Sequence, residues 1–167
     1  MNIFILRHGA AAERGSQDFA RDSDRPLTAE GQKQLHNASR AMEKMGLDFD
    51  LVLSSPFLRA RQTAEIVAKA LRVNKRLEFS EALTPGGTVE ALVRELNGRK
   101  PTPVNVLLVG HEPYLSRLIS RLISGGEDTA MDFKKGGLCK LEANCLRAGK
   151  CAVLAWLLTP KHMKWMA

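Results

Sequence analysis

The sequence predicts an α/β fold whose central sheet is mostly parallel and is covered by helices on both faces. Short apolar runs alternate along the chain with longer segments whose apolar residues recur at helical spacing. Such alternation is typical of parallel strands joined by helical crossovers. The last two apolar runs follow one another directly and resemble a hairpin. We therefore expect a three-layer α/β/α sandwich in which one strand is antiparallel.

Length and composition are those of a single globular domain spanning residues 1–167. The residues are 44% hydrophobic and 26% charged, and a chain of this length can bury one sizeable core. The longest apolar run, 152–158, is far shorter than the roughly 18 residues of a membrane span. Arg7 interrupts the apolar N-terminus before it could act as a signal sequence. We expect a cytoplasmic protein with no membrane partner.

The formal net charge of +7 raises the question of a nucleic-acid partner. The basic residues are spread along the chain without a run of five, however, and aromatic residues for stacking are few, with Tyr114 as the single tyrosine. We predict no nucleic-acid binding, and the charge is consistent with steering of anionic partners or with a solvated surface. The three cysteines fit no zinc spacing and are interpreted as buried apolar residues: Cys139, Cys145 and Cys151.

The N-terminal part of the chain predicts a strand, a loop and a helix. Residues 1–6 form an apolar strand, and the polar stretch 10–25 has no periodicity. Thr28 is a good N-cap for the helix that follows, and Gly46 ends it.

A second strand–helix unit comes next. The strand covers 50–53, after which Ser55 is predicted to cap a helix with Pro56 at its first position. A third strand at 75–79 is short and polar, as strands at a sheet edge often are.

The second half of the chain predicts two more helices, a central strand and a closing hairpin. Thr88 caps a helix that Gly98 ends, and another helix follows the strand end at Gly110-His111-Glu112-Pro113. The strand at 104–109 is strongly apolar, as strands buried on both faces are. The remaining elements are strands at 137–143 and 151–158, and a short helix or frayed end at 160–167.

Basic and imidazole side chains follow three of the predicted strands. Arg7 and His8 come directly after the first, Arg59 lies in the helix after the second, and His111 follows the central strand. The carboxyl ends of parallel strands meet at one edge of a sheet, where ligands bind. Two guanidinium groups and two imidazoles repel each other by several kcal/mol unless an anion lies between them. The pocket is therefore predicted to bind a phosphoryl group, whose oxygens match arginine geometry.

Two histidines in such a pocket allow nucleophilic catalysis. A neutral imidazole can attack phosphorus and form a phosphoenzyme that water hydrolyses, while the second imidazole donates a hydrogen bond to the oxygens. Gly9, directly after Arg7 and His8, would let a bulky anion approach the backbone closely. Taken alone, His8 and His111 could each be a structural histidine, and Arg59 a solvated helix residue like Arg61. Only the joint pattern favours a phosphoryl site.

The residues of this predicted site match a known family in order and spacing. Leu6-Arg7-His8-Gly9 resembles the signature of the histidine phosphatase superfamily, also called phosphoglycerate mutase-like. The stretch 54–64, SSPFLRARQTA, and the stretch Val109-Gly110-His111-Glu112 resemble its second and third blocks. Arg25-Pro26-Leu27-Thr28 is similar to a further common element. The similarity spans nearly the whole chain.

The resemblance implies a mechanism and a fold. His8 would be the phosphorylated nucleophile, in a pocket that needs no metal or other cofactor. Three further residues would complete that pocket: Arg7, Arg59 and His111. The fold would be a phosphoglycerate mutase-like sheet flanked by helices.

Within the superfamily, the short chain and its motifs look most like the SixA-type phosphohistidine phosphatases, which remove phosphate from histidine on a protein. Several residues beside the pocket are candidates for substrate binding, on spacing alone: Gly9, Ser16, Arg25, Lys134 and Lys135.

The general acid is where the chain departs from larger superfamily members. Those use a Glu or Asp, usually before a helical insertion that shapes a small-molecule pocket. Here the only candidate is Glu81, in the short loop 81–87, and it could equally cap or pair within that loop. A site without this insertion suits a phosphorylated side chain presented by a protein. A phosphoramidate also depends less on an acid, because its leaving nitrogen is readily protonated.

We therefore predict a metal-independent phosphatase that acts on protein phosphohistidine in signal transduction. The alternatives are a phosphatase for a small phosphate ester or for protein phosphoserine or phosphothreonine, and, from another class, a phosphate-binding interaction module without turnover. A mutase is disfavoured because it needs a closed pocket that keeps water from the phosphoenzyme. The expected partner is a phosphorylated protein, and the expected oligomeric state, which the sequence does not address, is a monomer.

Overall fold

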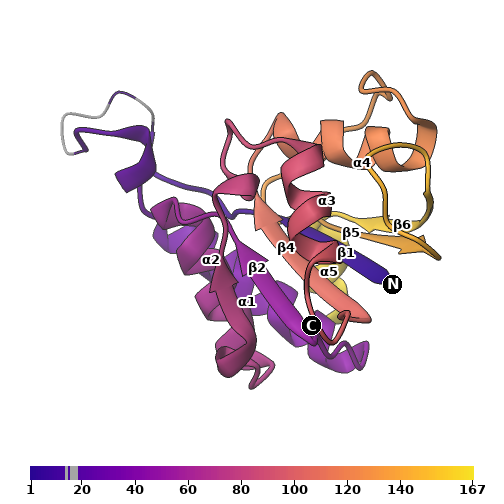
Figure 1. Ribbon diagram of the computed structural model, residues 1–167. Coiled ribbons are helices and arrows are strands. Elements are labelled where there is room, and N and C mark those ends of the chain that lie inside the picture. The colour runs from indigo at the N-terminus through magenta and orange to yellow at the C-terminus, as the bar shows by residue number, and fades with distance from the viewer. Residues whose placement is uncertain (14, 16–18) are drawn as a thin grey trace.

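A six-stranded sheet forms the centre of the computed structural model, which describes residues 1–13, 15 and 19–167 (Figure 1). Its strands are β1 (Asn2–Arg7), β2 (Leu51–Ser54), β3 (Leu77–Phe79), β4 (Asn105–Gly110), β5 (Leu138–Ala143) and β6 (Ala152–Leu158). They lie in the order β3-β2-β4-β1-β5-β6. Strands β1 to β4 are parallel, and β5 runs antiparallel to both of its neighbours. The predicted mostly parallel sheet with one antiparallel strand is confirmed.

Helices cover both faces of the sheet. They are α1 (Ala29–Lys44), α2 (Leu58–Ala70), α3 (Val89–Asn97), α4 (Tyr114–Ser124) and α5 (Pro160–Met166). Figure 1 shows α1 and α2 on one side of the sheet and α3 and α4 on the other. Successive β4 residues alternate between the two cores: Val106 and Leu108 pack with α3 and α4, whereas Leu107 and Val109 pack with α1 and α2. Burial on both faces explains why residues 106–109 of this strand are all apolar.

Two helices begin and end as their sequences predict. The Thr28 hydroxyl accepts a hydrogen bond from the Gly31 amide at the start of α1, and Gly46 has a left-handed φ of 68° just past its end. Thr88 caps α3 in the same way, and Gly98 follows its last residue.

Helix α2 begins later than the sequence predicts. Its first residue is Leu58, and Phe57 stands at the N-cap with an extended ψ of 133°. Ser55 does not cap the helix, because its hydroxyl lies in a turn where it accepts from the Phe57 amide and meets His111. The prediction that Pro56 occupies the first helical position was wrong for the same reason.

Two further segments refine the sequence interpretation. Residues Asn74–Arg76 form a 3-10 turn, so only the C-terminal part of the predicted third strand is β3, which lies at the sheet edge as expected. Helix α5 is fully formed and begins with a capping box between Thr159 and His162.

The cysteines correct one sequence interpretation. Cys139 is buried in β5, but Cys145 is exposed, because it lies in the connection after β5 rather than in the sheet. The prediction that all three are buried was therefore wrong. Within the described part of the chain, no three His, Cys, Asp or Glu side chains come together as a metal-binding group.

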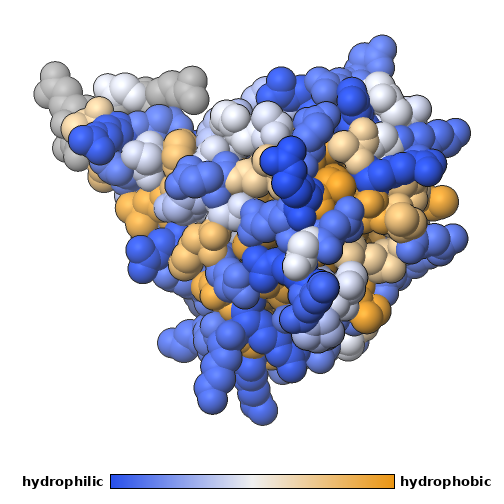
Figure 2. Space-filling model, viewed as in Figure 1, coloured by the Kyte–Doolittle hydropathy of each residue, from blue (hydrophilic) through white to orange (hydrophobic). Residues whose placement is uncertain are grey.

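The surface seen in Figure 2 is mostly hydrophilic, with smaller hydrophobic areas between the charged side chains. Among the residues that the structure describes, no helix has both the length and the apolar character of a membrane span.

Candidate phosphoryl-transfer site

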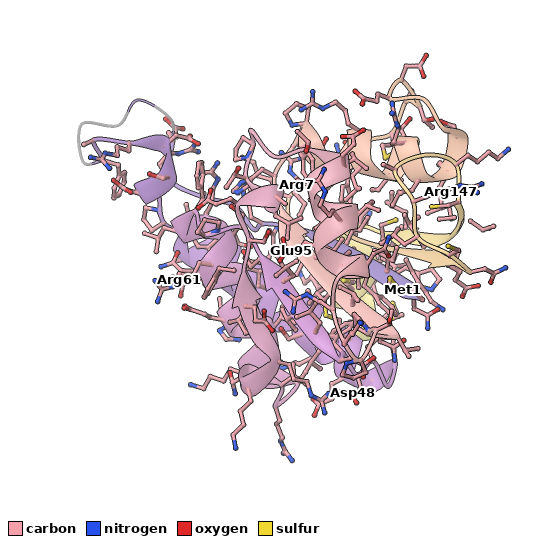
Figure 3. All side chains as sticks on the ribbon, in the orientation of Figure 1. Met1, Arg7, Asp48, Arg61, Glu95 and Arg147 are labelled. Atoms are coloured by element: carbon pink, nitrogen blue, oxygen red, sulfur yellow. The ribbon has the colours of Figure 1, made fainter. Side chains whose placement is uncertain are left out.

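Three strand ends bring the predicted site residues together. Strands β1 and β4 pair in parallel register, with Arg7 opposite Gly110, so the residues that follow are neighbours. The rings of His8 and His111 have centroids 5.1 Å apart, and Arg59 donates from Nε to His8 Nε2 over 3.3 Å. These three residues are only 6%, 1% and 3% exposed, respectively. Figure 3 shows Arg7 and Asp48 at opposite ends of the sheet, with Arg7 at the carboxyl end of β1.

The backbone fixes the tautomer of His8. Its Nδ1 lies 2.7 Å from the carbonyl oxygen of Gly9, which can only accept, so Nδ1 carries the proton. Its Nε2 therefore presents a lone pair, consistent with the hydrogen bond donated by Arg59. Burial, reinforced by the charges of Arg59, Arg7 and Lys135, lowers the pKa of His8 to about 3, although the bond to Gly9 opposes this. At neutral pH His8 is an uncharged imidazole whose Nε2 is unprotonated and can act as a nucleophile.

The contacts of His111 indicate which of its ring nitrogens carries the proton. Its Nε2 lies 2.8 Å from Ser55 Oγ, which already accepts from the Phe57 amide and so has its own proton to give to Nε2. This arrangement favours a proton on His111 Nδ1, which is buried and has no hydrogen-bond partner among the described residues. Burial, followed by the proximity of His8 and Arg59, lowers the pKa of His111 to about 3. His111 can thus offer one N–H donor toward a phosphoryl oxygen.

An acidic residue that the sequence analysis missed faces the cluster. Asp22 lies in the 3-10 turn η1 (Asp22–Asp24), and its backbone oxygen and Oδ2 accept from Arg59 Nη1 and Nη2 at 2.6 and 2.9 Å. Its Oδ1 accepts from Arg25 Nη1 at 2.6 Å. Burial acts to raise the pKa of Asp22, but the hydrogen bonds from Arg25 and Arg59 lower it to about 2.

These contacts modify the predicted electrostatics of the pocket. The sequence suggested four mutually repelling cationic groups, but burial keeps both imidazoles neutral and Asp22 supplies a carboxylate to Arg59. Nothing in the sequence set Asp22 apart from the other acids of its polar loop. Phe57 also packs against Arg59, whose Cζ lies 5.5 Å from the ring centroid, and against His111.

Gly9 has a packing role that differs from the sequence interpretation. A Cβ there would lie 2.9 Å from Leu35 Cδ1 and 3.2 Å from the Gly31 oxygen, so the glycine allows α1 to approach the end of β1. The Gly9 amide donates to Thr63 Oγ1, which itself donates to the Arg59 carbonyl oxygen. Thr63 therefore links the segment that follows His8 to α2. Substrate binding by Gly9 stays a prediction.

Arg7 reaches toward the loop before β5. Its Nη1 donates to the carbonyl oxygen of Phe133 over 2.6 Å, and its Nε is buried with no partner among the described residues. Burial lowers the pKa of Arg7, against the influence of Glu112 and Asp132.

The remaining candidates lie around this centre or outside it. Arg25 is held by Asp22 and by the Ala12 carbonyl oxygen. Glu81 begins the 3-10 turn η3 (Glu81–Leu83), where its side chain is exposed and makes no hydrogen bond to the two histidines or Arg59 among the described residues. Ser16 lies outside the described residues.

Comparison with known proteins identifies the family to which the chain is similar. The model of the histidine phosphatase superfamily (branch 1) matches residues 3–84. The chain is 36% identical to the phosphohistidine phosphatase SixA of Escherichia coli K12, over 75% of this chain and 76% of the relative. It is 33% identical to the probable phosphoglycerate mutase GpmB of Yersinia enterocolitica, over 97% of this chain and 77% of the relative.

A solved structure shares the whole architecture. The structure of the protein histidine phosphatase SixA complexed with tungstate superposes with a TM-score of 0.84 at 30% identity, covering 98% of this chain and all of that one. The sequence motifs, the phosphoglycerate mutase-like sheet and the similarity to SixA all indicate the same family. The chain belongs to the histidine phosphatase superfamily.

Proposed function

We propose that this chain is a phosphatase that transfers a phosphoryl group from protein phosphohistidine to His8 and then to water. The observation that carries the proposal is the state of His8, whose Nδ1 is held by the Gly9 carbonyl while Nε2 keeps its lone pair. Burial holds the pKa of His8 at about 3, so no base is needed to activate it at neutral pH. Adjacent cationic groups suit the negative oxygens of a phosphoryl group.

In the first step, Nε2 of His8 attacks phosphorus in line with the leaving nitrogen. A new N–P bond forms as the N–P bond of the substrate breaks, and the leaving imidazole carries a proton that it already holds or takes from solvent. Arg7 and Arg59 bind the non-bridging oxygens, and His111 donates from Nδ1. Donors of this kind, fixed before the reaction, each contribute about 10²–10³ in kcat.

In the second step, water attacks the phosphorus of phospho-His8. The N–P bond breaks, the electron pair returns to Nε2, and inorganic phosphate leaves with the oxygen and protons of the water or passes a proton to solvent. His8 is again neutral, because Nδ1 keeps its proton, hydrogen-bonded to the Gly9 carbonyl oxygen, throughout.

The choice of substrate rests on the surroundings of the site. Residues 80–88, between β3 and α3, form a short connection, and among the described residues the exposed Glu81 makes no hydrogen bond to the central histidines. This favours a phosphoramidate, whose nitrogen needs little help from an acid, over an ester. The related SixA proteins support the same choice, and tungstate, which one of them binds, is a tetrahedral oxyanion like phosphate.

The deciding experiment compares substrates at matched concentrations, with a chelator present throughout because the resemblance predicts no metal requirement. A phosphohistidine-bearing protein, a phosphoserine peptide and a small aryl phosphate are assayed with wild type and with His8→Ala. We expect the highest kcat/KM for the phosphohistidine protein, and no turnover of any substrate by His8→Ala. A preference for the phosphoserine peptide would overturn the substrate assignment.

A phosphatase for small esters is the second candidate, supported by the 33% identity to a probable phosphoglycerate mutase over 97% of this chain. The variant Glu81→Gln tests whether the site supplies an acid for ester leaving groups. If Glu81 protonates poor leaving groups, the variant loses ester hydrolysis and retains phosphoramidate hydrolysis. If ester hydrolysis is unchanged, Glu81 is not the acid.

A further inference from the structure

A basic groove adjoins the phosphoryl pocket on the side of Arg7. It encloses about 690 Å³, and its charged lining consists of Arg7, Lys134, Lys135, Lys161 and Asp132. Four cationic side chains therefore face one carboxylate. Neutral residues from α1 and from the start of α5, such as Gln34 and Pro160, complete the walls.

The lysines of this groove are fixed relative to the nucleophile. The Gly136 amide donates to the carbonyl oxygens of Arg7 and His8 at 3.1 and 3.0 Å, and the Arg7 amide donates to the Gly137 carbonyl oxygen. Gly136 takes a left-handed φ of 73°, which turns the chain at this point. The loop that carries Lys134 and Lys135 is thus hydrogen-bonded to the segment that carries His8.

The charge of the groove is only partly neutralised. Lys134 pairs with Asp132 over 2.5 Å, whereas Lys135 and Lys161 have no carboxylate partner within 4.0 Å among the described residues. Lys161 lies instead over the ring of Trp165, 5.1 Å from its centroid. Lys135 is close enough to lower the pKa of His8. The groove consequently presents excess positive charge next to the reacting atoms.

We infer that this groove binds an acidic segment of the protein substrate beside the phosphorylated residue. The inference rests on the proposed function. The volume is of the size that holds a drug-like ligand or a few side chains and greatly exceeds what a single inorganic anion fills. Complementary charge at such a surface selects among partners and speeds their encounter. The groove recognises Asp and Glu side chains near the phosphohistidine.

The test uses charge reversal at Lys161, with Lys164→Glu as the matched control on the same helix. Lys164 is exposed in the last turn of α5 and does not line the groove. Two phosphohistidine-bearing proteins are compared, one with Asp and Glu beside the phosphorylated residue and one with Gln and Ser at those positions. We expect wild type to prefer the acidic substrate, and Lys161→Glu to reduce the acidic-to-neutral ratio of kcat/KM about tenfold, mainly through KM.

The possible outcomes distinguish failure of the groove inference from failure of the proposed function. Equal ratios for Lys161→Glu and Lys164→Glu, or a wild type that does not distinguish the two proteins, would overturn the inference while leaving phosphohistidine hydrolysis intact. If wild type hydrolyses neither protein, the proposed function fails. Lys161→Glu could instead lose activity toward a small bisphosphate while its acidic-to-neutral ratio of kcat/KM for the two proteins stays unchanged. That result would assign the groove to a small molecule and would also overturn the inference. The second variant Lys161→Gln, which removes charge without adding repulsion, should give a smaller change in the same direction.

Discussion

The Nε–H of Arg59 donates to Nε2 of His8 over 3.3 Å, so the lone pair that would attack phosphorus in the proposed mechanism is the acceptor of an arginine hydrogen bond. One lone pair cannot serve both purposes, and formation of the N–P bond therefore displaces this hydrogen bond. The guanidinium can then donate to a phosphoryl oxygen beside the same nitrogen. In the proposed mechanism, Arg59 thereby holds His8 in position before the reaction and stabilises negative charge during it.

The pair formed by Ser55 and His111 makes the first prediction. Ser55→Ala removes the hydroxyl that donates to His111 Nε2. Without this hydrogen bond, the His111 proton can lie on either ring nitrogen and is no longer held on Nδ1. We expect kcat to fall about tenfold, which corresponds to loss of roughly one hydrogen bond in the transition state. Steady-state kinetics check this. The matched control is Ser54→Ala, whose buried hydroxyl donates only to the Ser55 carbonyl oxygen, and an equal loss in both variants would contradict the assigned role.

Asp22 makes the second prediction. Its carboxylate competes with a phosphoryl group for the Arg59 guanidinium, so Asp22→Asn should strengthen inhibition by inorganic phosphate. We expect the inhibition constant to fall about fivefold, the effect of roughly 1 kcal/mol. Asp24→Asn is the control, because it removes the same charge from the same turn but its carboxylate bonds to Ser23 instead. Equal changes in both variants would show a general charge effect and no specific competition.

Acid stability makes the third prediction. Burial holds the pKa values of His8 and His111 at about 3 in the folded protein, against 6.5 when unfolded. Below pH 6.5 the unfolded chain binds protons that the folded chain does not, so stability is lost as the pH falls from 6.5 toward 3. Between pH 7.5 and 5 the loss is roughly 2 kcal/mol for each histidine.

Urea unfolding at pH 7.5 and 5 measures this loss. The double variant with Gln at both positions removes the two titrating groups, so its free energy of unfolding should change less between the two pH values. If wild type and the double variant lose the same stability, the two histidines are not responsible.

The sequence predicts those parts of the site that are set by local pattern. Strand ends at Arg7 and Gly110 follow from apolar runs, and parallel pairing then brings His8 and His111 together without further information. The caps at Thr28 and Thr88 are equally local, because hydroxyl and acceptor lie within one turn.

Other features depend on contacts between distant segments and could not be predicted in this way. Ser55 followed by proline has the pattern of a helix cap, but its contact with His111, 56 positions further along, decides its role. Asp22 reaches Arg59 only through the path of an irregular loop. The need for glycine at position 9 arises from the approach of α1, with Leu35 as the nearest side chain, which the residues beside it do not reveal.

The central claim is that His8 becomes phosphorylated, and trapping the phosphoenzyme tests it most directly. Wild type and His8→Ala are mixed with a phosphoryl donor that carries a radioactive label, quenched rapidly in alkali, digested and mapped. We expect a label on the peptide containing His8 that is stable in alkali and lost in acid, and neither label nor turnover in His8→Ala. A His8→Ala variant with full activity, or a wild-type label on another residue, would contradict it.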